Sequence, residues 1–166
     1  MEVLFIKAKP EEAKELSELR RKVWLTTYRG IYPDEIMDNF DYAAHNAKDL
    51  ERITNPEFDV LFITANGQRA GYLVLQKKEP LYIQSLYLLE EFRGMGIGRK
   101  AFEYIYDFCR KEGRESFCLG CHPQNIKALG FYEKMGGTVT ERDEGHQNNR
   151  ENSLKIEFKV PKKSAP

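Results

Sequence analysis

The chain has 166 residues, enough for one sizeable hydrophobic core, and we expect residues 1–160 to form a single domain and 161–166 a disordered tail. Its 26 Lys and Arg residues balance 26 Asp and Glu residues, which excludes the strongly basic face that binds nucleic-acid phosphates. No apolar run approaches the roughly 20 residues of a membrane helix, and no export signal is recognisable. We therefore expect a cytoplasmic monomer or homodimer that binds neither nucleic acid nor membrane.

The first third of the sequence predicts one strand and three helical segments. Residues 3–6 form the strand, and Pro10, which two acidic residues follow, suits a helix start. Pro33 then begins two short, polar helical segments, residues 34–40 and 42–53. Helical spacing predicts one buried stripe on the first helix: Ala13, Leu16, Leu19, Val23, Trp24, Thr27 and Tyr28.

The remainder predicts strands interrupted by two helices. Residues 59–65, 71–76 and 81–88 form an antiparallel meander with turns at 66–67 and 78–80. A long helix over 97–111, a strand over 116–121 and a helix over 124–135 follow, then strands over 138–142 and 153–160 that flank a polar loop. This order predicts an α+β fold with a mixed, mostly antiparallel twisted sheet of about seven strands flanked by about four helices.

A glycine-rich turn joins the strand over 81–88 to the long helix. Glycine permits a tight turn and leaves the backbone open, and the amides at a helix start attract anions, so we expect a phosphate there. The Walker lysine loop is excluded because no Gly-Lys-Ser/Thr follows, and the dinucleotide fingerprint is excluded because these glycines are two residues apart. The turn reads Arg93-Gly94-Met95-Gly96-Ile97-Gly98.

Two motifs resemble those of the GNAT superfamily of N-acetyltransferases. The spacing of Arg93, Gly96 and Gly98 is similar to the family's acetyl-CoA signature, Arg/Gln-x-x-Gly-x-Gly/Ala. About 30 residues on, residues 125–136 resemble its pattern Asn-x-x-Ala-x-x-Phe-Tyr-x-Lys-x-Gly-Phe, with Gly137 where the final Phe is usual, so another residue must supply that contact. The element order also matches, which implies a GNAT-like fold over nearly the whole chain.

The resemblance implies direct acetyl transfer from acetyl-CoA to an amine, with no metal. It places the Tyr132 hydroxyl at the thioester sulfur as a general acid, and Asn125 on the pantetheine arm. The oxyanion donor is a backbone amide near Leu88, exposed where two neighbouring strands separate. The implied cofactor-binding residues are Leu86, Leu88, Arg93, Gly94, Met95, Gly96, Ile97, Gly98, Arg99, Asn125 and Lys134.

The acceptor amine stays open. Family members that modify protein N-termini often carry Glu where this chain has Gly120, so we expect a small amine or polyamine instead. A non-catalytic module that binds or senses acyl-CoA is the alternative function. The aromatic-rich segment 24–40 covers the acceptor in the family, and the candidate substrate contacts are Tyr28, Tyr32, Phe40 and His122.

The sequence does not support these candidate substrate contacts and bases equally. Tyr28 also belongs to the buried stripe, where a core role is the more usual one, which leaves Tyr32 and Phe40 as the better contacts. His122 could act as a base with its pKa near 6.5, although a histidine before a turn is more commonly a solvated loop residue. His45, Glu35 and Asp34 are further candidates for the base, among which the sequence does not decide.

A competing string, Cys118-Leu119-Gly120-Cys121-His122, matches both the haem c attachment pattern and a redox Cys-x-x-Cys pair. Haem attachment requires export, and residues three apart on a strand face opposite sides, which does not suit a redox pair. A zinc site needs further ligands at suitable spacing. We therefore expect the three cysteines to be reduced thiols.

Overall fold

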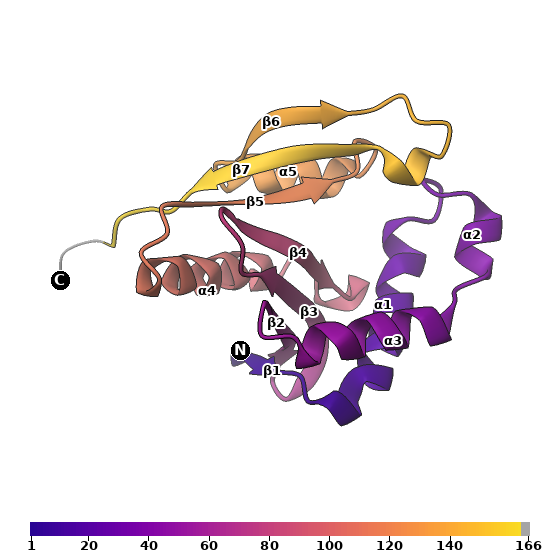
Figure 1. Ribbon diagram of the computed structural model, residues 1–166, viewed down its shortest axis with the longest axis horizontal. Helices are drawn as coiled ribbons and strands as arrows, with labels where there is room; N and C mark the ends of the chain where they lie inside the picture. Colours follow the sequence, from indigo (N-terminus) through magenta and orange to yellow (C-terminus); the bar gives the residue numbers. More distant parts are fainter. Residues whose placement is uncertain (164–166) are drawn as a thin grey trace.

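The computed structural model describes residues 1–163, and its strands form one seven-stranded sheet (Figure 1). The strands are β1 (Val3–Lys7), β2 (Phe58–Ala65), β3 (Gln68–Gln76), β4 (Leu81–Leu88), β5 (Ser116–Cys121), β6 (Thr138–Asp143) and β7 (Ser153–Lys159). The α-helices in this part of the chain are α1 (Ala13–Thr27), α2 (Asp34–Asp38), α3 (Tyr42–Thr54), α4 (Ile97–Lys111) and α5 (Ile126–Lys134). Short 3-10 helices are η1 (Pro10–Glu12), η2 (Glu90–Phe92) and η3 (Asn149–Glu151).

The sheet is mixed and mostly antiparallel, which confirms the predicted fold class. Its strand order is β1-β2-β3-β4-β5-β7-β6, and only the β4–β5 neighbours run parallel. The bounds of β4, β5 and α4 are the predicted ones, and the polar loop before β7 contains η3. Of the predicted tail, residues 164–166 lie outside the described residues, whereas the Pro161 carbonyl accepts two hydrogen bonds from Arg110 of α4.

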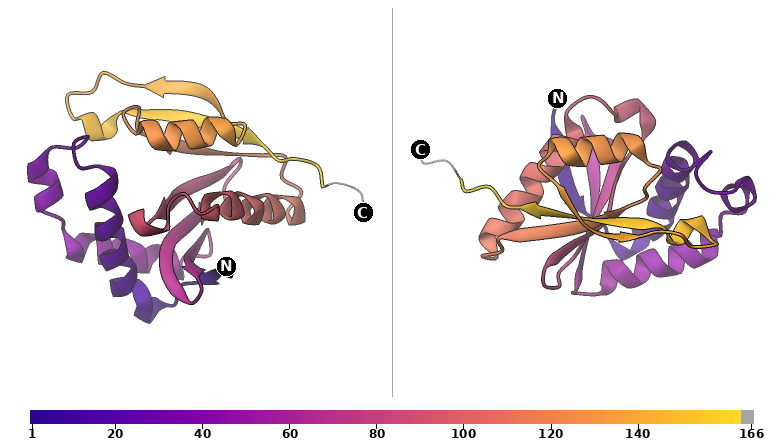
Figure 2. Two further views of the ribbon diagram at one scale, coloured as in Figure 1. Left: turned by 180° about the vertical axis from the view of Figure 1, so that it is seen from behind. Right: turned by 90° about the horizontal axis from the view of Figure 1, so that it is seen from above.

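Helices cover both faces of the sheet (Figure 2). Alternate residues of one strand point to opposite faces, so Phe62 of β2 packs beneath Leu16 of α1, whereas the neighbouring Ile63 packs on the other side with Phe102 of α4. The larger core lies between the sheet and α4 and α5, and the smaller one between the sheet and α1. Two hydrophobic layers therefore hold the sheet between them.

The separation of strands expected near Leu88 is present. The parallel pairing of β4 with β5 consists of Leu81 with Phe117, Tyr82 with Cys118 and Ile83 with Leu119, and it ends there. Beyond that point β4 continues beside β3, while β5 continues beside β7. The C-terminal halves of two adjacent strands therefore separate, and we call this break in strand pairing the cleft.

Gly137 occupies the position where the resemblance leads us to expect Phe. A Cβ atom there would lie 2.6 Å from Ile156 Cγ2 and 2.8 Å from the Phe158 ring. Both residues belong to β7 and are buried in the larger core. Side chains of β7 therefore supply the contact that the missing Phe would make.

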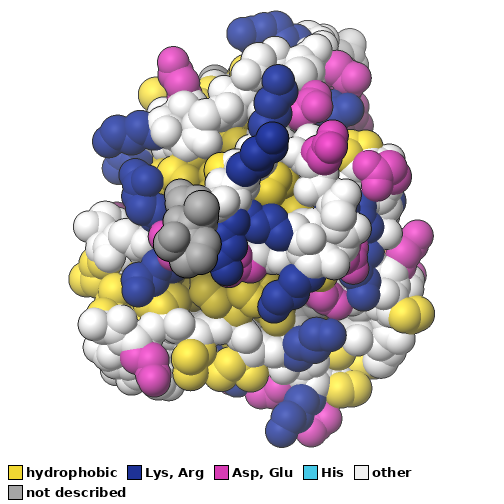
Figure 3. Space-filling model, turned by 90° about the vertical axis from the view of Figure 1, so that its left-hand side faces the viewer, with side chains coloured by type: hydrophobic (Ala, Val, Ile, Leu, Met, Phe, Trp, Pro, Cys, Tyr) yellow, Lys and Arg dark blue, Asp and Glu magenta, His cyan; other side chains and the backbone are white. Residues whose placement is uncertain are grey.

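The surface carries both signs of charge. On the face that holds the end of the described chain, Lys and Arg side chains lie among Asp and Glu side chains (Figure 3). This distribution agrees with the formal net charge of zero. In the described residues, no helix has the length and hydropathy needed to cross a membrane.

A substitution at Gly71 tests how closely β3 and β4 approach each other. A Cβ atom at this position would lie 2.0 Å from the Tyr87 carbonyl oxygen, so we expect Gly71→Ala to lower the free energy of unfolding by about 1–3 kcal/mol, as overpacking does. Urea denaturation measures the change. Gly130→Ala is the matched control in open space on α5, where the same substitution should stabilise by about 0.4–1 kcal/mol. Equal stability of the two variants would contradict this close approach.

Candidate active site

The glycine turn before α4 needs glycine at two positions. Gly94 and Gly96 have φ angles of 76° and 82°, in the left-handed region that other residues rarely adopt. A Cβ atom at either position would meet nothing within 4 Å, so this side of the turn is open. A ligand can therefore approach the backbone directly.

Backbone donors converge on that open side. The N–H groups of Gly94 and of residues 96–99, which we call the amide row, have no hydrogen-bond partner among the described residues, whereas the Arg93 and Lys100 N–H groups on either side are bonded to carbonyls. The row includes the first turn of α4, where the helix dipole is positive. Such a row has the geometry of a phosphate site.

The side chains of the turn point elsewhere. Met95 and Arg99 are exposed, and Ile97 is anchored in the larger core. Gly98 has a packing role, because a Cβ atom there would lie 3.0 Å from the Phe131 ring of α5. The third glycine of the motif therefore allows α4 to pack closely against α5.

The Arg93 side chain turns back toward the cleft and α1. Its Nε donates a hydrogen bond to the Leu88 carbonyl at 3.1 Å, and a terminal nitrogen donates to Thr26 Oγ1 at 3.3 Å and Thr27 Oγ1 at 3.0 Å. The guanidinium thus ties the glycine turn to the last strand residue and to the C-terminal end of α1.

Two strand amides face the cleft. The Leu89 N–H donates to the Ala70 carbonyl, so it points toward β3. Because N–H directions alternate along a strand, the Leu88 and Leu86 N–H groups point to the other side, where β5 no longer pairs. Both groups are therefore free to bind an extended arm or a carbonyl oxygen.

Tyr132 approaches the cleft region from α5. Its ring is buried near Phe102 and Phe158 at centroid distances of 6.3 and 6.1 Å. The hydroxyl makes no hydrogen bond to a described residue, yet it is not among the fully buried unpartnered atoms, so it reaches the surface. Burial raises the pKa of Tyr132, and nearby Cys121 and Tyr87 add to the shift. The hydroxyl therefore remains a proton donor at neutral pH.

The other predicted residues of α5 lie at its two ends. Asn125 Oδ1 accepts a hydrogen bond from the Ala128 N–H at 3.4 Å and so caps the helix. Lys134 is exposed and, with Phe131, lines an open hollow on the helix surface. Since Phe131 also contacts Gly98, this hollow adjoins the glycine turn.

An aromatic cluster, defined as Trp24, Tyr28, Tyr32, Phe40 and Tyr87, lies beside the cleft. The Tyr28 and Tyr32 rings stack at 4.3 Å, and the Trp24 ring meets those of Tyr32 and Phe40 at 6.0 and 5.9 Å. The Tyr28 hydroxyl is hydrogen-bonded to that of Tyr87, a β4 residue between the two free strand amides. Tyr28 is buried, as its stripe position predicts, and Tyr32 and Phe40 are half-buried.

Candidate bases have other partners. His122 is buried, its Nδ1 accepts a hydrogen bond from the Gln124 N–H, and its Nε2 therefore carries the proton that it donates to the Asn149 carbonyl at 2.7 Å. Asp34 pairs with Arg29, and His45 stacks on the Phe40 ring at 4.3 Å. Burial lowers the pKa of His45.

Sequence reasoning missed two parts of this region. Tyr87 lies at the end of a predicted strand, where alternation could have placed it on the face of α1, opposite the larger core. Arg150 belongs to η3 in the polar loop, and no motif marks it. Its guanidinium carbon lies 5.6 Å from the Trp24 ring and 5.5 Å from the Tyr32 ring.

The cysteine string forms no cluster with other metal-binding side chains. Cys109, Cys118 and Cys121 are buried free thiols, and the last two lie on β5. Nowhere in residues 1–163 do three His, Cys, Asp or Glu residues gather as a metal site requires.

Comparison with known proteins decides the family. The family model described as the acetyltransferase (GNAT) family matches residues 14–137. The chain belongs to this GNAT acetyltransferase family. Its relatives include a spermidine N(1)-acetyltransferase of Thermoplasma acidophilum, 29% identical over 142 residues, which are 80% of this chain and 86% of the relative. N-alpha-acetyltransferase 50 of Danio rerio is 30% identical over 124 residues, 61% of this chain and 74% of the relative.

Solved GNAT structures share the fold. The PaiA N-acetyltransferase of Thermoplasma acidophilum, in complex with coenzyme A, superposes with a TM-score of 0.76 at 22% identity. The match covers 96% of this chain and 99% of that chain. The seven-stranded sheet of this GNAT protein is thus the family's fold.

The thiols of this GNAT protein should be unreactive in the folded state. Burial raises the pKa of Cys121 to about 12 and that of Cys109 to about 11, and it also raises the pKa of Cys118. Since only the thiolate reacts, and about a quarter of an unperturbed thiol is ionised at pH 8, we expect labelling by a disulfide reagent at pH 8 to be at least about a hundredfold slower than in guanidinium. One fast-reacting thiol in the native protein would contradict this.

Proposed function

We propose that this acetyltransferase transfers the acetyl group of acetyl-CoA directly to the amine of a small molecule. The observation that carries the proposal is the position of the amide row beside a cleft into which the free Leu86 and Leu88 amides point. One end of this arrangement suits a pyrophosphate, and the other suits an extended arm that ends in a carbonyl. Acetyl-CoA has both groups and supplies the acetyl group as a thioester.

Different residues would bind different parts of acetyl-CoA. The amide row would bind the pyrophosphate, the strand amides would pair with the pantetheine arm, and Asn125 and Lys134 would contact it from α5. The Leu88 N–H would stabilise negative charge on the thioester oxygen, because a preorganised donor costs no reorganisation during the reaction. No metal takes part in this scheme.

Tyr132 would protonate the departing thiolate. The high pKa of its buried hydroxyl keeps the proton in place at pH 7, and the hydroxyl has no described protein partner that would hold it elsewhere. His122 does not compete for proton transfer, because both of its ring nitrogens are occupied. Its place is structural, between β5 and η3.

The amine has to lose its own proton. An amine with a pKa near 10.4 costs about 4.6 kcal/mol to deprotonate at pH 7, whereas an α-amine near pKa 8 costs about 1.4 kcal/mol. Spermidine, which the name of one relative specifies, has amines of the first kind. Because both ring nitrogens of His122 are hydrogen-bonded, we propose that water accepts the proton of the amine. Water is a weak base, so this route favours small amines whose pKa is low.

Tyr132→Phe tests the acid. Loss of the hydroxyl should lower kcat for thiol release about a hundredfold, within the usual range for general acid catalysis, and leave the Kd for coenzyme A unchanged because the ring is retained. Tyr106→Phe on α4 is the control and should keep full activity. An unchanged rate in Tyr132→Phe would remove Tyr132 from the mechanism. If coenzyme A binds and no amine in a broad panel releases thiol, the protein is a binding or sensing module.

Gly96→Val tests the amide row. A side chain with positive φ costs about 1–2 kcal/mol and covers the open face, so we expect the Kd for coenzyme A, measured by calorimetry, to rise at least tenfold. Gly113→Val is the control, since Gly113 has a φ of 69° but lies after the other end of α4. It should show a similar loss of stability and a normal Kd. Equal affinities of Gly96→Val and the wild type for coenzyme A would refute a phosphate site at this turn.

A further inference from the structure

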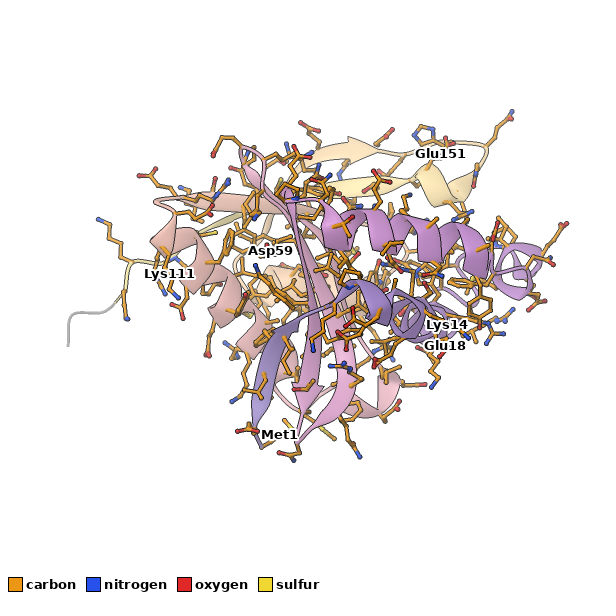
Figure 4. All side chains as sticks on the ribbon, turned by 60° about the horizontal axis from the view of Figure 1, so that its bottom comes forward. Met1, Lys14, Glu18, Asp59, Lys111 and Glu151 are labelled. Carbon is orange, nitrogen blue, oxygen red and sulfur yellow. The ribbon has the colours of Figure 1, made fainter. Side chains whose placement is uncertain are left out.

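The loop before β7 places one arginine over the aromatic cluster. In Figure 1, η3 lies next to the connection between α1 and α2, and Figure 4 shows its last residue, Glu151, at the opposite end of the molecule from Lys111. The guanidinium carbon of Arg150 lies 5.6 Å from the Trp24 ring and 5.5 Å from the Tyr32 ring. Both distances are within the range of cation–π attraction.

Hydrogen bonds hold this loop in place. The Asn149 carbonyl accepts the His122 Nε2–H, and Asn149 Nδ2 donates to the Ile31 carbonyl at 2.7 Å. These bonds join η3 both to the end of β5 and to the segment between α1 and α2. Arg150 is therefore positioned by two other parts of the chain, although its own side chain is exposed.

The guanidinium of Arg150 makes no ion pair or side-chain hydrogen bond within residues 1–163. Other arginines at the surface do so, among them Arg29 with Asp34, Arg114 with Glu112 and Arg142 with Glu144. Glu151, the neighbour of Arg150, pairs with His146 instead. The five donors of this guanidinium thus remain available to a ligand.

Arg150 is the charged side chain that acts on Tyr32, whereas Asp34 and Asp38 of α2 pair with Arg29 and Glu151 of η3 pairs with His146. No described carboxylate forms a hydrogen bond or ion pair with Tyr28, Tyr32, Tyr87 or Tyr132. Burial raises the pKa of Tyr32, and Arg150 is a charge that opposes this shift. A second ammonium group on the acceptor would therefore meet a like charge here, whereas a carboxylate would find a bidentate partner.

We infer that the acceptor is a small amine that also carries a carboxylate, as an amino acid does, and that Arg150 binds this carboxylate and so determines specificity. The inference rests on the proposed acetyl transfer and names the acceptor class of that site. The aromatic cluster and Arg150 would bind the body and the carboxylate of the acceptor, and its amine would point into the cleft toward the Leu88 amide.

A panel of matched amines tests the inference. Thiol release is measured for each amino acid beside its own carboxamide, and for spermidine and putrescine. The best amino acid should exceed its carboxamide at least tenfold in kcat/KM, because a hydrogen-bonded ion pair is stronger than a hydrogen bond to a neutral amide. Amine basicity cannot produce this preference, because the carboxamide loses its amine proton more readily.

Variants assign the preference to one side chain. Arg150→Gln should bring the ratio of kcat/KM between an amino acid and its carboxamide close to one, mainly by raising KM for the amino acid. Arg150→Glu should shift the preference to carboxamides and polyamines. Arg142→Gln, a change of the same kind at an exposed position on β6, should keep the wild-type ratio. Melting temperatures of all three should stay within a few degrees of wild type, because these side chains are at the surface.

The outcomes separate this inference from the function on which it rests. Thiol release that is equal for acids and carboxamides, or highest for spermidine, would overturn the assignment of a carboxylate and leave acetyl transfer standing. If Arg150→Gln keeps the wild-type preference for amino acids over their carboxamides, the role of Arg150 would be overturned. Coenzyme A binding without thiol release from any amine would overturn acetyl transfer itself, and the acceptor assignment with it.

Discussion

The early end of pairing between β4 and β5 is the constraint on which the rest of the site depends. Inside a sheet, backbone groups that lose their neighbour must find other partners or face solvent. Here the break begins after Ile83 and Leu119 and exposes the inner edge of β4. Arg93 satisfies the Leu88 carbonyl at the mouth, and the amides of Leu86 and Leu88 remain for a ligand. A local loss of sheet pairing thus leaves backbone donors available for the proposed binding of acetyl-CoA.

The two helical layers bring different chemistry to this break. Tyr132 arrives from α5 on one face, and Tyr28 arrives from α1 on the other. The position of α1 is supported by a buried ion pair in which Arg20 binds Asp49 of α3 at 2.6 Å and reaches the Tyr72 hydroxyl at 3.5 Å. Tyr72 in turn packs against Tyr87, 5.5 Å between ring centroids. The proposed proton donor and the aromatic cluster are therefore held by separate cores on opposite sides of one sheet.

Features that depend on residues close together in the sequence could be predicted from the sequence alone. The bounds of β4, β5 and α4 follow from runs of apolar residues and from the glycine turn, and the left-handed φ angles of Gly94 and Gly96 agree with that turn. Features that depend on distant residues were not predictable in this way. Gly98 belongs to a helix contact that exists only once α5 is in place, and Ile156 fills the space at Gly137 from β7.

The same distinction explains the acceptor side. The sequence favours a solvated loop position for His122 over a base, yet the residue is buried. Its partners, the Gln124 N–H and the Asn149 carbonyl, are backbone groups that leave no side-chain pattern. Arg150 lies in a polar loop 118 residues beyond Tyr32, and only folding brings them together. Charge composition could not locate it, since the chain holds 26 basic residues.

The amide row has a consequence for how this protein can diversify. Its donors belong to the backbone, so the identities of Met95 and Arg99 are not constrained by anion binding, whereas the φ angles of Gly94 and Gly96 are. The proposed acceptor surface, in contrast, consists of side chains on α1, the α1–α2 connection and η3. Mutation can therefore alter acceptor choice through these side chains while the recognition of the acetyl donor is inherited unchanged.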